Sequence, residues 1–173
     1  MKKALIAYYS RAGENYFGGT LKELETGNTE LAARMIADIT GGKLFKIEQS
    51  EPYSESYNEC IEQARRDARN GVRPKIKALP DDITDFDTVY LGFPNYWGSA
   101  PMAVFTFLDG VNLSGKDVYL FCTHEGSGMG SAERDIKKEY GLKPSGSLAL
   151  RGCRISDSRG EIEKWIKSTE EKK

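Results

Sequence analysis

The chain has few of the residues that mark metal-binding, disulfide-stabilised or nucleic-acid-binding proteins. Its three cysteines, Cys60, Cys122 and Cys153, are odd in number and widely spaced, which predicts reduced thiols in an intracellular protein and no metal site. The net charge is -1, so bulk electrostatics favour neither nucleic acid nor an anionic membrane as a partner. No apolar run is long enough to span a membrane. We therefore expect a cytoplasmic protein without membrane insertion.

What the chain does contain is the composition of a globular domain. Hydrophobic residues make up 39% and charged residues 29% of its 173 residues, which are ordinary values for one core. Apolar, β-rich runs alternate with segments of helical periodicity, without a linker between them. The expected strands are residues 3–9, 43–48, 87–93, 117–123 and 147–155. The alternation predicts a single α/β domain over residues 1–173, with a parallel sheet between two layers of helices.

Polar residues after the first expected strand form a pattern suited to a phosphate group. Residues 10–13 follow that strand, and residues 27–29 precede an amphipathic segment. A phosphate needs hydroxyl or amide donors and the free N–H groups of a helix N-terminus. Ser10, Asn28 and Thr29 offer such side chains. Asn28 or Thr29 could instead only cap the helix, but the strand end and the small-residue turn before them favour phosphate.

Two large aromatic residues stand in the turn after the third expected strand. Residues 94–101 read Pro-Asn-Tyr-Trp-Gly-Ser-Ala-Pro. In an open α/β sheet, a loop at the carboxyl end of a strand is where ligands bind. Tyr96 and Trp97 therefore predict a planar ring as the ligand. Core packing is the alternative for one of them, and the sequence leaves open which of the two touches the ring.

The turn after the fourth expected strand, residues 123–130, is rich in glycine. Glycine lets the backbone come close to the flat edge of a ligand. The Gly126-x-Gly128 spacing is a weak dinucleotide signal, because it follows the wrong strand and lacks the full motif. His124 is the only histidine, and we expect it to contribute backbone to the loop and not to act as a catalyst.

Together the three loops resemble those of the flavodoxins, and the resemblance covers nearly the whole chain. The flavodoxin phosphate loop reads Ser/Thr-x-Thr-Gly-Asn-Thr; here Ala12 replaces a usual threonine, and residues 13–26 are inserted before Gly27. A rival register ends the loop at residues 13–15, but Gly18 and Gly19 begin a helix poorly. We expect residues 14–26 to be a mobile cover without regular structure.

The resemblance implies a flavodoxin-like, doubly wound sheet of strand order 2-1-3-4-5 that binds FMN. It makes Trp97 the main residue to stack on the flavin, with Tyr96 second, and Gly98 the position most tolerant of a peptide flip. The implied cofactor-binding residues are Ser10, Arg11, Ala12, Asn28, Thr29, Pro94, Asn95, Tyr96, Trp97, Gly98, Thr123, His124, Glu125, Gly126, Ser127 and Gly128.

The function implied by the resemblance is electron transfer, with the flavin cycling between oxidised, semiquinone and hydroquinone states. No residue is expected to act as a general acid or base, and the partner is a redox protein or a small-molecule electron acceptor. Two alternatives remain open. The first is an NAD(P)H-dependent quinone or flavin reductase on the same fold, which the near-neutral charge supports because electron-carrying flavodoxins are typically strongly acidic. The second is a flavin-free binding module.

Overall fold

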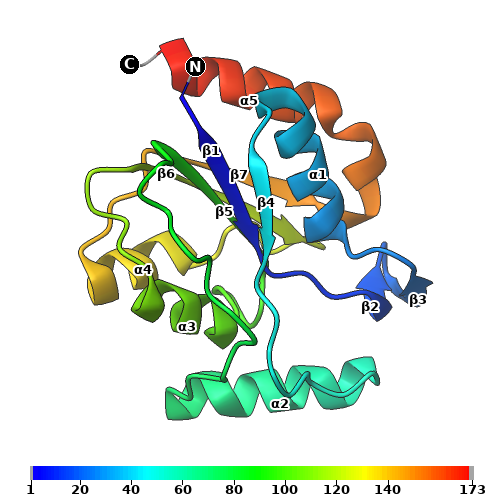
Figure 1. The fold of residues 1–173 in the computed structure, drawn as a ribbon. Helices are drawn as coiled ribbons and strands as arrows, with labels where there is room; N and C mark the ends of the chain where they lie inside the picture. Colours follow the sequence, from blue (N-terminus) through cyan, green and yellow to red (C-terminus); the bar gives the residue numbers. More distant parts are fainter. Residues whose placement is uncertain (1, 172–173) are drawn as a thin grey trace.

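Five parallel strands form the central sheet of the computed structural model, which describes residues 2–171 (Figure 1). In spatial order they are β4 (Lys43–Lys46), β1 (Ala4–Tyr8), β5 (Thr88–Pro94), β6 (Asp117–His124) and β7 (Gly146–Arg151). This is the expected 2-1-3-4-5 order, and the predicted α/β fold is confirmed. Residues 1, 172 and 173 of the expected domain lie outside the described residues.

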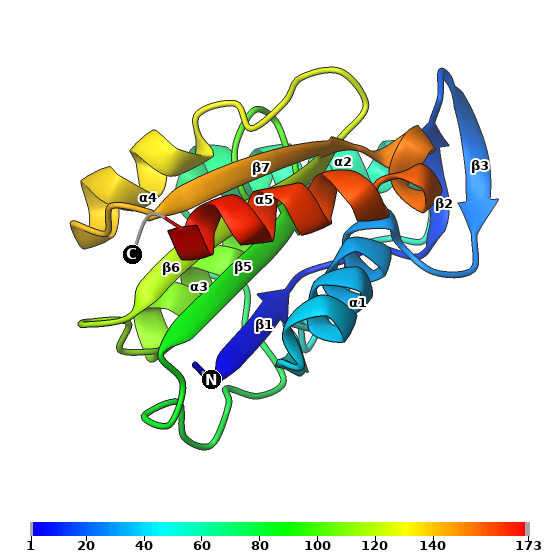
Figure 2. The same ribbon diagram turned by 90° about the horizontal axis from the view of Figure 1, so that it is seen from above.

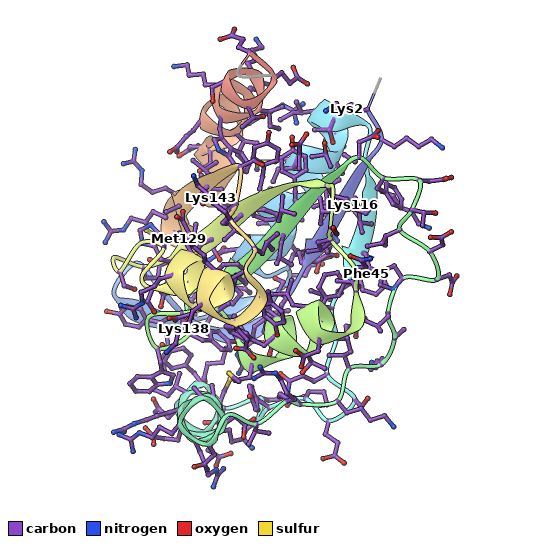
Figure 3. All side chains as sticks on the ribbon, turned by 90° about the vertical axis from the view of Figure 1, so that its left-hand side faces the viewer. Lys2, Phe45, Lys116, Met129, Lys138 and Lys143 are labelled. Carbon is purple, nitrogen blue, oxygen red and sulfur yellow. The ribbon has the colours of Figure 1, made fainter. Side chains whose placement is uncertain are left out.

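Helices cover both faces of the sheet, which explains why its central strands are apolar throughout. The helices α1 (Asn28–Thr40) and α5 (Arg159–Glu171) lie on one face, and α3 (Met102–Gly110) and α4 (Ala132–Tyr140) lie on the other (Figure 1). In β1, Leu5 packs in the cluster under α3 and α4, whereas Ile6 packs in the cluster under α1 and α5. Phe45 and Met129, both labelled in Figure 3, are partly buried against the first of these clusters. No helix within residues 2–171 is long and apolar enough to cross a membrane.

The helix α2 (Tyr57–Asn70) covers neither face of the sheet. It lies beyond the carboxyl ends of the strands (Figure 1) and contacts α3 and the β2 strand. Only Cys60 and Ala64 of this helix are buried. The apolar stripe that Tyr57, Ile61 and Ala64 form at helical spacing therefore faces the space at the ends of the strands, where ligands bind in open α/β sheets.

The segment after β1 is a β-hairpin, so the expectation of a cover without regular structure was wrong. The β2 (Gly13–Phe17) and β3 (Thr20–Leu24) strands pair antiparallel and stand beside the start of α1 (Figure 2). Gly18 and Gly19 connect them with φ values of 60° and 101°, which is the backbone that a two-residue hairpin turn requires. Because α1 begins at Asn28, the rival register of the first loop is also wrong.

The fifth strand ends at Arg151 and not at residue 155 as expected from the sequence. Residues Gly152–Asp157 form the 3₁₀ helix η1 instead. The change begins at Gly152, where an added Cβ would lie only 2.5 Å from Asn28 Nδ2 and 2.5 Å from Glu125 Oε1. The ends of these two side chains thus lie against the backbone where η1 meets the start of α1.

Candidate functional site

A cavity of about 440 Å³ lies at the carboxyl ends of β5 and β6, within the size range of small-molecule sites. The hairpin and α2 complete its wall. The described residues that line it are Arg11, Asn15, Tyr16, Asn28, Thr29, Tyr57, Cys60, Ile61, Ala64, Pro94, Asn95, Tyr96, Trp97, Gly98, Thr123, His124, Glu125, Gly126, Ser127 and Gly152.

The cavity brings together most of the residues that the sequence singled out. Of the predicted set, only Ser10, Ala12 and Gly128 are not part of its lining. The residues that sequence reasoning missed come from the hairpin, from α2 and from Gly152. The amphipathic stripe of α2 was visible in the sequence, and the paired glycines of the hairpin turn were a second usable signal.

Ser10 completes the first turn of α1 from outside the helix. Gly27 is the N-cap residue and makes no side-chain cap bond, so neither Asn28 nor Thr29 is the cap. The Ser10 Oγ accepts a hydrogen bond of 3.1 Å from the backbone N–H of Glu30. An added Cβ at Gly27 would lie 2.2 Å from the same Oγ, so the first loop and the helix start touch directly.

Arg11 lines the cavity, but its guanidinium is committed to backbone carbonyls. Nη1 and Nη2 donate to the carbonyls of Ser54 and Glu55, at 2.9 and 2.8 Å, and Nε donates to the carbonyl of Glu14 at 3.3 Å. Glu14 in turn accepts a hydrogen bond from the backbone N–H of Tyr57 at 2.8 Å. Arg11 therefore joins the hairpin to the start of α2.

The aromatic loop is a tight turn with an unusual backbone. Tyr96 and Ser99 exchange backbone hydrogen bonds of 2.8 and 3.2 Å, and the two residues between them both have positive φ. Gly98 adopts its value of 83° without cost, whereas Trp97, at 54°, is the one described non-glycine residue with a positive φ. Such a conformation costs a large side chain about 1–3 kcal/mol, and strain of this kind clusters at functional sites.

The turn points its two aromatic rings in different directions. Trp97 is 51% exposed, and its indole N–H donates to the carbonyl of Ile61 in α2 at 2.7 Å. Tyr96 packs edge-on against Tyr9, with ring centroids 5.8 Å apart, and its buried hydroxyl has no hydrogen-bond partner among the described residues. Trp97 thus presents a ring at the cavity rim, whereas Tyr96 is mainly a packing residue.

Asn95 fixes this turn to the glycine-rich loop. Its Oδ1 accepts from the backbone N–H of Gly98, and its Nδ2 donates to the carbonyl of Gly128, both at 2.9 Å. The carbonyl of Gly98 accepts from both the backbone N–H and the hydroxyl of Ser131. A flip of the peptide between Trp97 and Gly98 would therefore break the hydrogen bond from the Gly98 N–H to Asn95 Oδ1.

Burial favours the neutral forms of three titratable groups of the cavity wall, Tyr96, Cys60 and His124. Burial raises the pKa of the Tyr96 phenol well above its usual value, and burial also raises the pKa of the Cys60 thiol. The pKa of His124 is lowered, first by burial and then by the Arg151 guanidinium. In agreement, His124 Nδ1 accepts a hydrogen bond of 2.9 Å from the backbone N–H of Gly126. Within residues 2–171 no cluster of three or more metal-ligating side chains is present.

Known structures share this architecture over almost the full length of the chain. A protein from Bacteroides eggerthii classed as a flavoprotein is 27% identical, with a TM-score of 0.76 and 98% of both chains covered. A flavoprotein from Lactobacillus acidophilus in complex with FMN is 20% identical, with a TM-score of 0.64 over 92% of this chain and 99% of that one. Oxidised flavodoxin 1 from Bacillus cereus is 14% identical, with a TM-score of 0.56 over 98% of each chain.

Curated protein sequences give no match to the chain. The sequence model of the flavodoxin family, in contrast, matches residues 3–169. That match spans the sheet, both helical layers and every loop of the cavity. The chain therefore belongs to the flavodoxin family.

Proposed function

We propose that the protein binds FMN non-covalently in this cavity and transfers electrons through it. The observation that carries the proposal is that one cavity is lined both by the first turn of α1 and by the ring of Trp97. A helix N-terminus suits a phosphate, and an exposed indole suits a planar ring. The FMN bound by the Lactobacillus acidophilus flavoprotein, which shares the fold, supports this choice of ligand.

The residues present fit such a ligand. The backbone of Gly27 lies against Ser10 and the carbonyl of Arg11, which excludes a side chain there, and the backbone of Gly152 lies close to the Asn28 side chain. Asn28 and Thr29, which line the cavity, would hold the phosphate there, and Gly126 and Ser127 would meet the edge of the ring. Ser10 would support the first turn of α1 through its hydrogen bond from the N–H of Glu30. When bound, the flavin supplies the one- and two-electron chemistry, and the protein supplies its position and surroundings.

The wall of the cavity suits electron transfer better than acid–base catalysis. Burial raises the pKa of the Tyr96 phenol and of the Cys60 thiol, which makes both poor bases, and Nδ1 of His124 already accepts a hydrogen bond from Gly126. Asn95 would instead hold the Trp97 turn in one position against the glycine-rich loop. The electron would go to a redox protein or to a small-molecule acceptor.

The visible absorption spectrum of the purified protein tests this proposal. We expect flavin bands, either as isolated or after addition of FMN, and mass spectrometry of the released cofactor should identify FMN. FAD as the dominant species would contradict the single phosphate site. A colourless protein that takes up no FMN would favour a binding module without flavin.

A reductase on the same fold is the second candidate, and the near-neutral net charge of -1 favours it. A strongly acidic surface would suit docking to basic redox proteins, whereas this chain carries 25 basic and 26 acidic residues. Anaerobic addition of NADH or NADPH to the FMN-loaded protein separates the two functions. Bleaching of the flavin bands by either nucleotide alone would identify a reductase, and unchanged bands would support the electron carrier.

A further inference from the structure

The carboxylate of Glu125 lies at the end of the cavity where α1 begins. Glu125 follows β6, and its Oε1 and the Nδ2 of Asn28 both lie 2.5 Å from the position that a Cβ of Gly152 would occupy. The two side chains therefore meet over the same point of the backbone. Because Asn28 is the first residue of α1, this carboxylate stands beside the N–H groups that would hold a phosphate.

One of its two oxygens is unpaired. Oε2 accepts a hydrogen bond of 3.2 Å from the backbone N–H of Gly18, at the tip of the hairpin. Oε1 is buried, and none of the described residues hydrogen-bonds to it. A buried carboxylate oxygen without a donor is costly, which makes it an unusual group to place next to an anion site.

Neither of the two nearby arginines donates to this carboxylate. Arg11 is the one lysine or arginine among the described residues that line the cavity, and its nitrogens donate to backbone carbonyls. The Nη2 of Arg151 donates to the main-chain carbonyl of Glu125, not to its side chain. Glu30, the carboxylate in the first turn of α1, differs because it forms ion pairs with Arg34 and Lys46.

We infer that Glu125 opposes the phosphate of FMN and thereby sets how strongly the site discriminates between FMN and flavins that lack a phosphate. The inference rests on the proposed function of the same cavity. A phosphate carries up to two negative charges, and like charges repel strongly where water is excluded. Riboflavin carries a neutral hydroxyl in place of the phosphate, which has no such repulsion and can donate a hydrogen bond to a carboxylate.

Affinity measurements on two matched variants test this inference. Glu125→Gln keeps the shape of the side chain and an oxygen that can accept from Gly18, but removes the charge. Glu161→Gln removes an exposed carboxylate from α5 and is the control for net charge. Dissociation constants for FMN and for riboflavin would be measured with each protein by titration of the apoprotein.

We expect Glu125→Gln to bind FMN about tenfold more tightly than the wild type, with the riboflavin constant changed less than about twofold. Glu161→Gln should bind both ligands as the wild type does. Glu125→Ala is a second charge-free variant in case the first folds poorly. It loses the contact with Gly18, so its affinities for both ligands can fall. The dissociation constant for FMN should still decrease relative to that for riboflavin.

The possible failures are distinct. If the wild type binds both flavins and the ratio of the two constants is the same in Glu125→Gln and Glu125→Ala, the inference about Glu125 is overturned while the proposed FMN site stands. Weaker FMN binding by Glu125→Gln at constant riboflavin affinity would show that the carboxylate supports the phosphate instead. A wild-type protein that binds neither flavin would overturn the proposed function and this inference together.

Discussion

The hydroxyl oxygens of Thr29 and Thr123 lie 2.7 Å apart and join the first turn of α1 to the end of β6. Both side chains are buried, with exposures of 1% and 4%, and both residues line the cavity. Since one of the two hydroxyls donates, the other keeps its proton for a further acceptor. A ligand phosphate at the start of α1 would be such an acceptor, which links the strand, the helix and the proposed phosphate site.

Replacing Thr29 with Val should weaken FMN far more than riboflavin. A lost hydrogen bond to a charged group costs roughly 1.5–3 kcal/mol, which is about a 10- to 150-fold increase in the dissociation constant for FMN. Thr123→Val is the matched control, because it breaks the same pair of hydroxyls and keeps that of Thr29. Equal losses of FMN and riboflavin in the Thr29 variant, measured by fluorescence titration, would show that this hydroxyl only fastens α1 to β6.

Replacing Gly27 with Ala should destabilise the protein. The new Cβ would lie 2.2 Å from Ser10 Oγ and 2.5 Å from the carbonyl oxygen of Arg11, and the second of these belongs to the backbone. Overpacking of this kind typically costs about 1–3 kcal/mol of unfolding free energy. Gly160→Ala is the control, because no atom lies within 4 Å of its added Cβ. Urea denaturation with equal midpoints for the two variants would contradict the close contact at Gly27.

The central strands could be predicted from the sequence because strands buried on both faces consist almost entirely of apolar residues. Every residue of β1 is buried, and β5 is buried up to Phe93, so apolar runs alone locate them. Gly18 and Gly19 are poor helix formers, and that property alone does not predict the hairpin. The same pair also fits a two-residue turn, and pairing such as that of Tyr16 with Leu21 decides between the two.

Which surface an apolar stripe covers could not be predicted, because periodicity shows that a helix face is apolar and not what lies against it. The stripe of α2 includes Tyr57 and Ile61, which line the cavity instead of covering the sheet. Gly152 was beyond sequence reasoning for a similar reason. It lines the cavity through its closeness to Asn28 and Glu125, which are distant in the chain.

Replacing Tyr16 with Ala should speed the release of FMN. Tyr16 lines the cavity from the hairpin, and its ring stacks on that of Tyr57 with centroids 6.3 Å apart. An aromatic pair contributes about 0.5–1.5 kcal/mol beyond its buried area. Loss of the contact between Tyr16 and Tyr57 would loosen the hairpin at the cavity wall by that amount, so the dissociation rate of FMN should rise roughly 2- to 12-fold. Leu21→Ala is the control, because Leu21 pairs with Tyr16 in the hairpin but is not part of the cavity lining. Equal release rates in stopped-flow experiments would exclude the hairpin from retention of the cofactor.

His124 should make the protein less stable as the pH falls from neutrality. Its pKa is lowered in the folded state, first by burial and then by Arg151, whereas the unfolded value is about 6.5. The folded state therefore binds fewer protons, so this contribution is complete above about pH 6.5 and is lost as the pH falls through the folded pKa. Protonation of Nδ1 would also break the hydrogen bond from Gly126.

The measurement is the free energy of unfolding in urea between about pH 5 and pH 7.5, for the wild type and His124→Gln. Because His124 is the only histidine, the difference between the two curves isolates its titration. The wild type should lose stability below about pH 6.5 relative to the variant. Parallel curves across this range would show that the imidazole has the same pKa in both states.

Replacing Trp97 with Ala should weaken flavin binding and raise the reduction potential for the second electron. Loss of the indole removes a stacking surface, which contributes about 0.5–1.5 kcal/mol beyond buried area. It also admits water to the ring, and water stabilises the negative charge of the fully reduced flavin. Dissociation constants and spectroelectrochemical titrations would measure the two effects.

Trp97→Phe separates stacking from the anchoring of α2, because it keeps a flat ring and loses the indole N–H that donates to the carbonyl of Ile61. If stacking dominates, Trp97→Phe should retain most of the affinity and potential that Trp97→Ala loses. If both variants lose affinity and change potential to the same extent, the hydrogen bond from the indole N–H to the Ile61 carbonyl accounts for the effect. Tyr96→Ala tests the remaining alternative. A change of potential in that variant, with wild-type values in both Trp97 variants, would assign the flavin platform to Tyr96, and no change in any of them would place the flavin away from this turn.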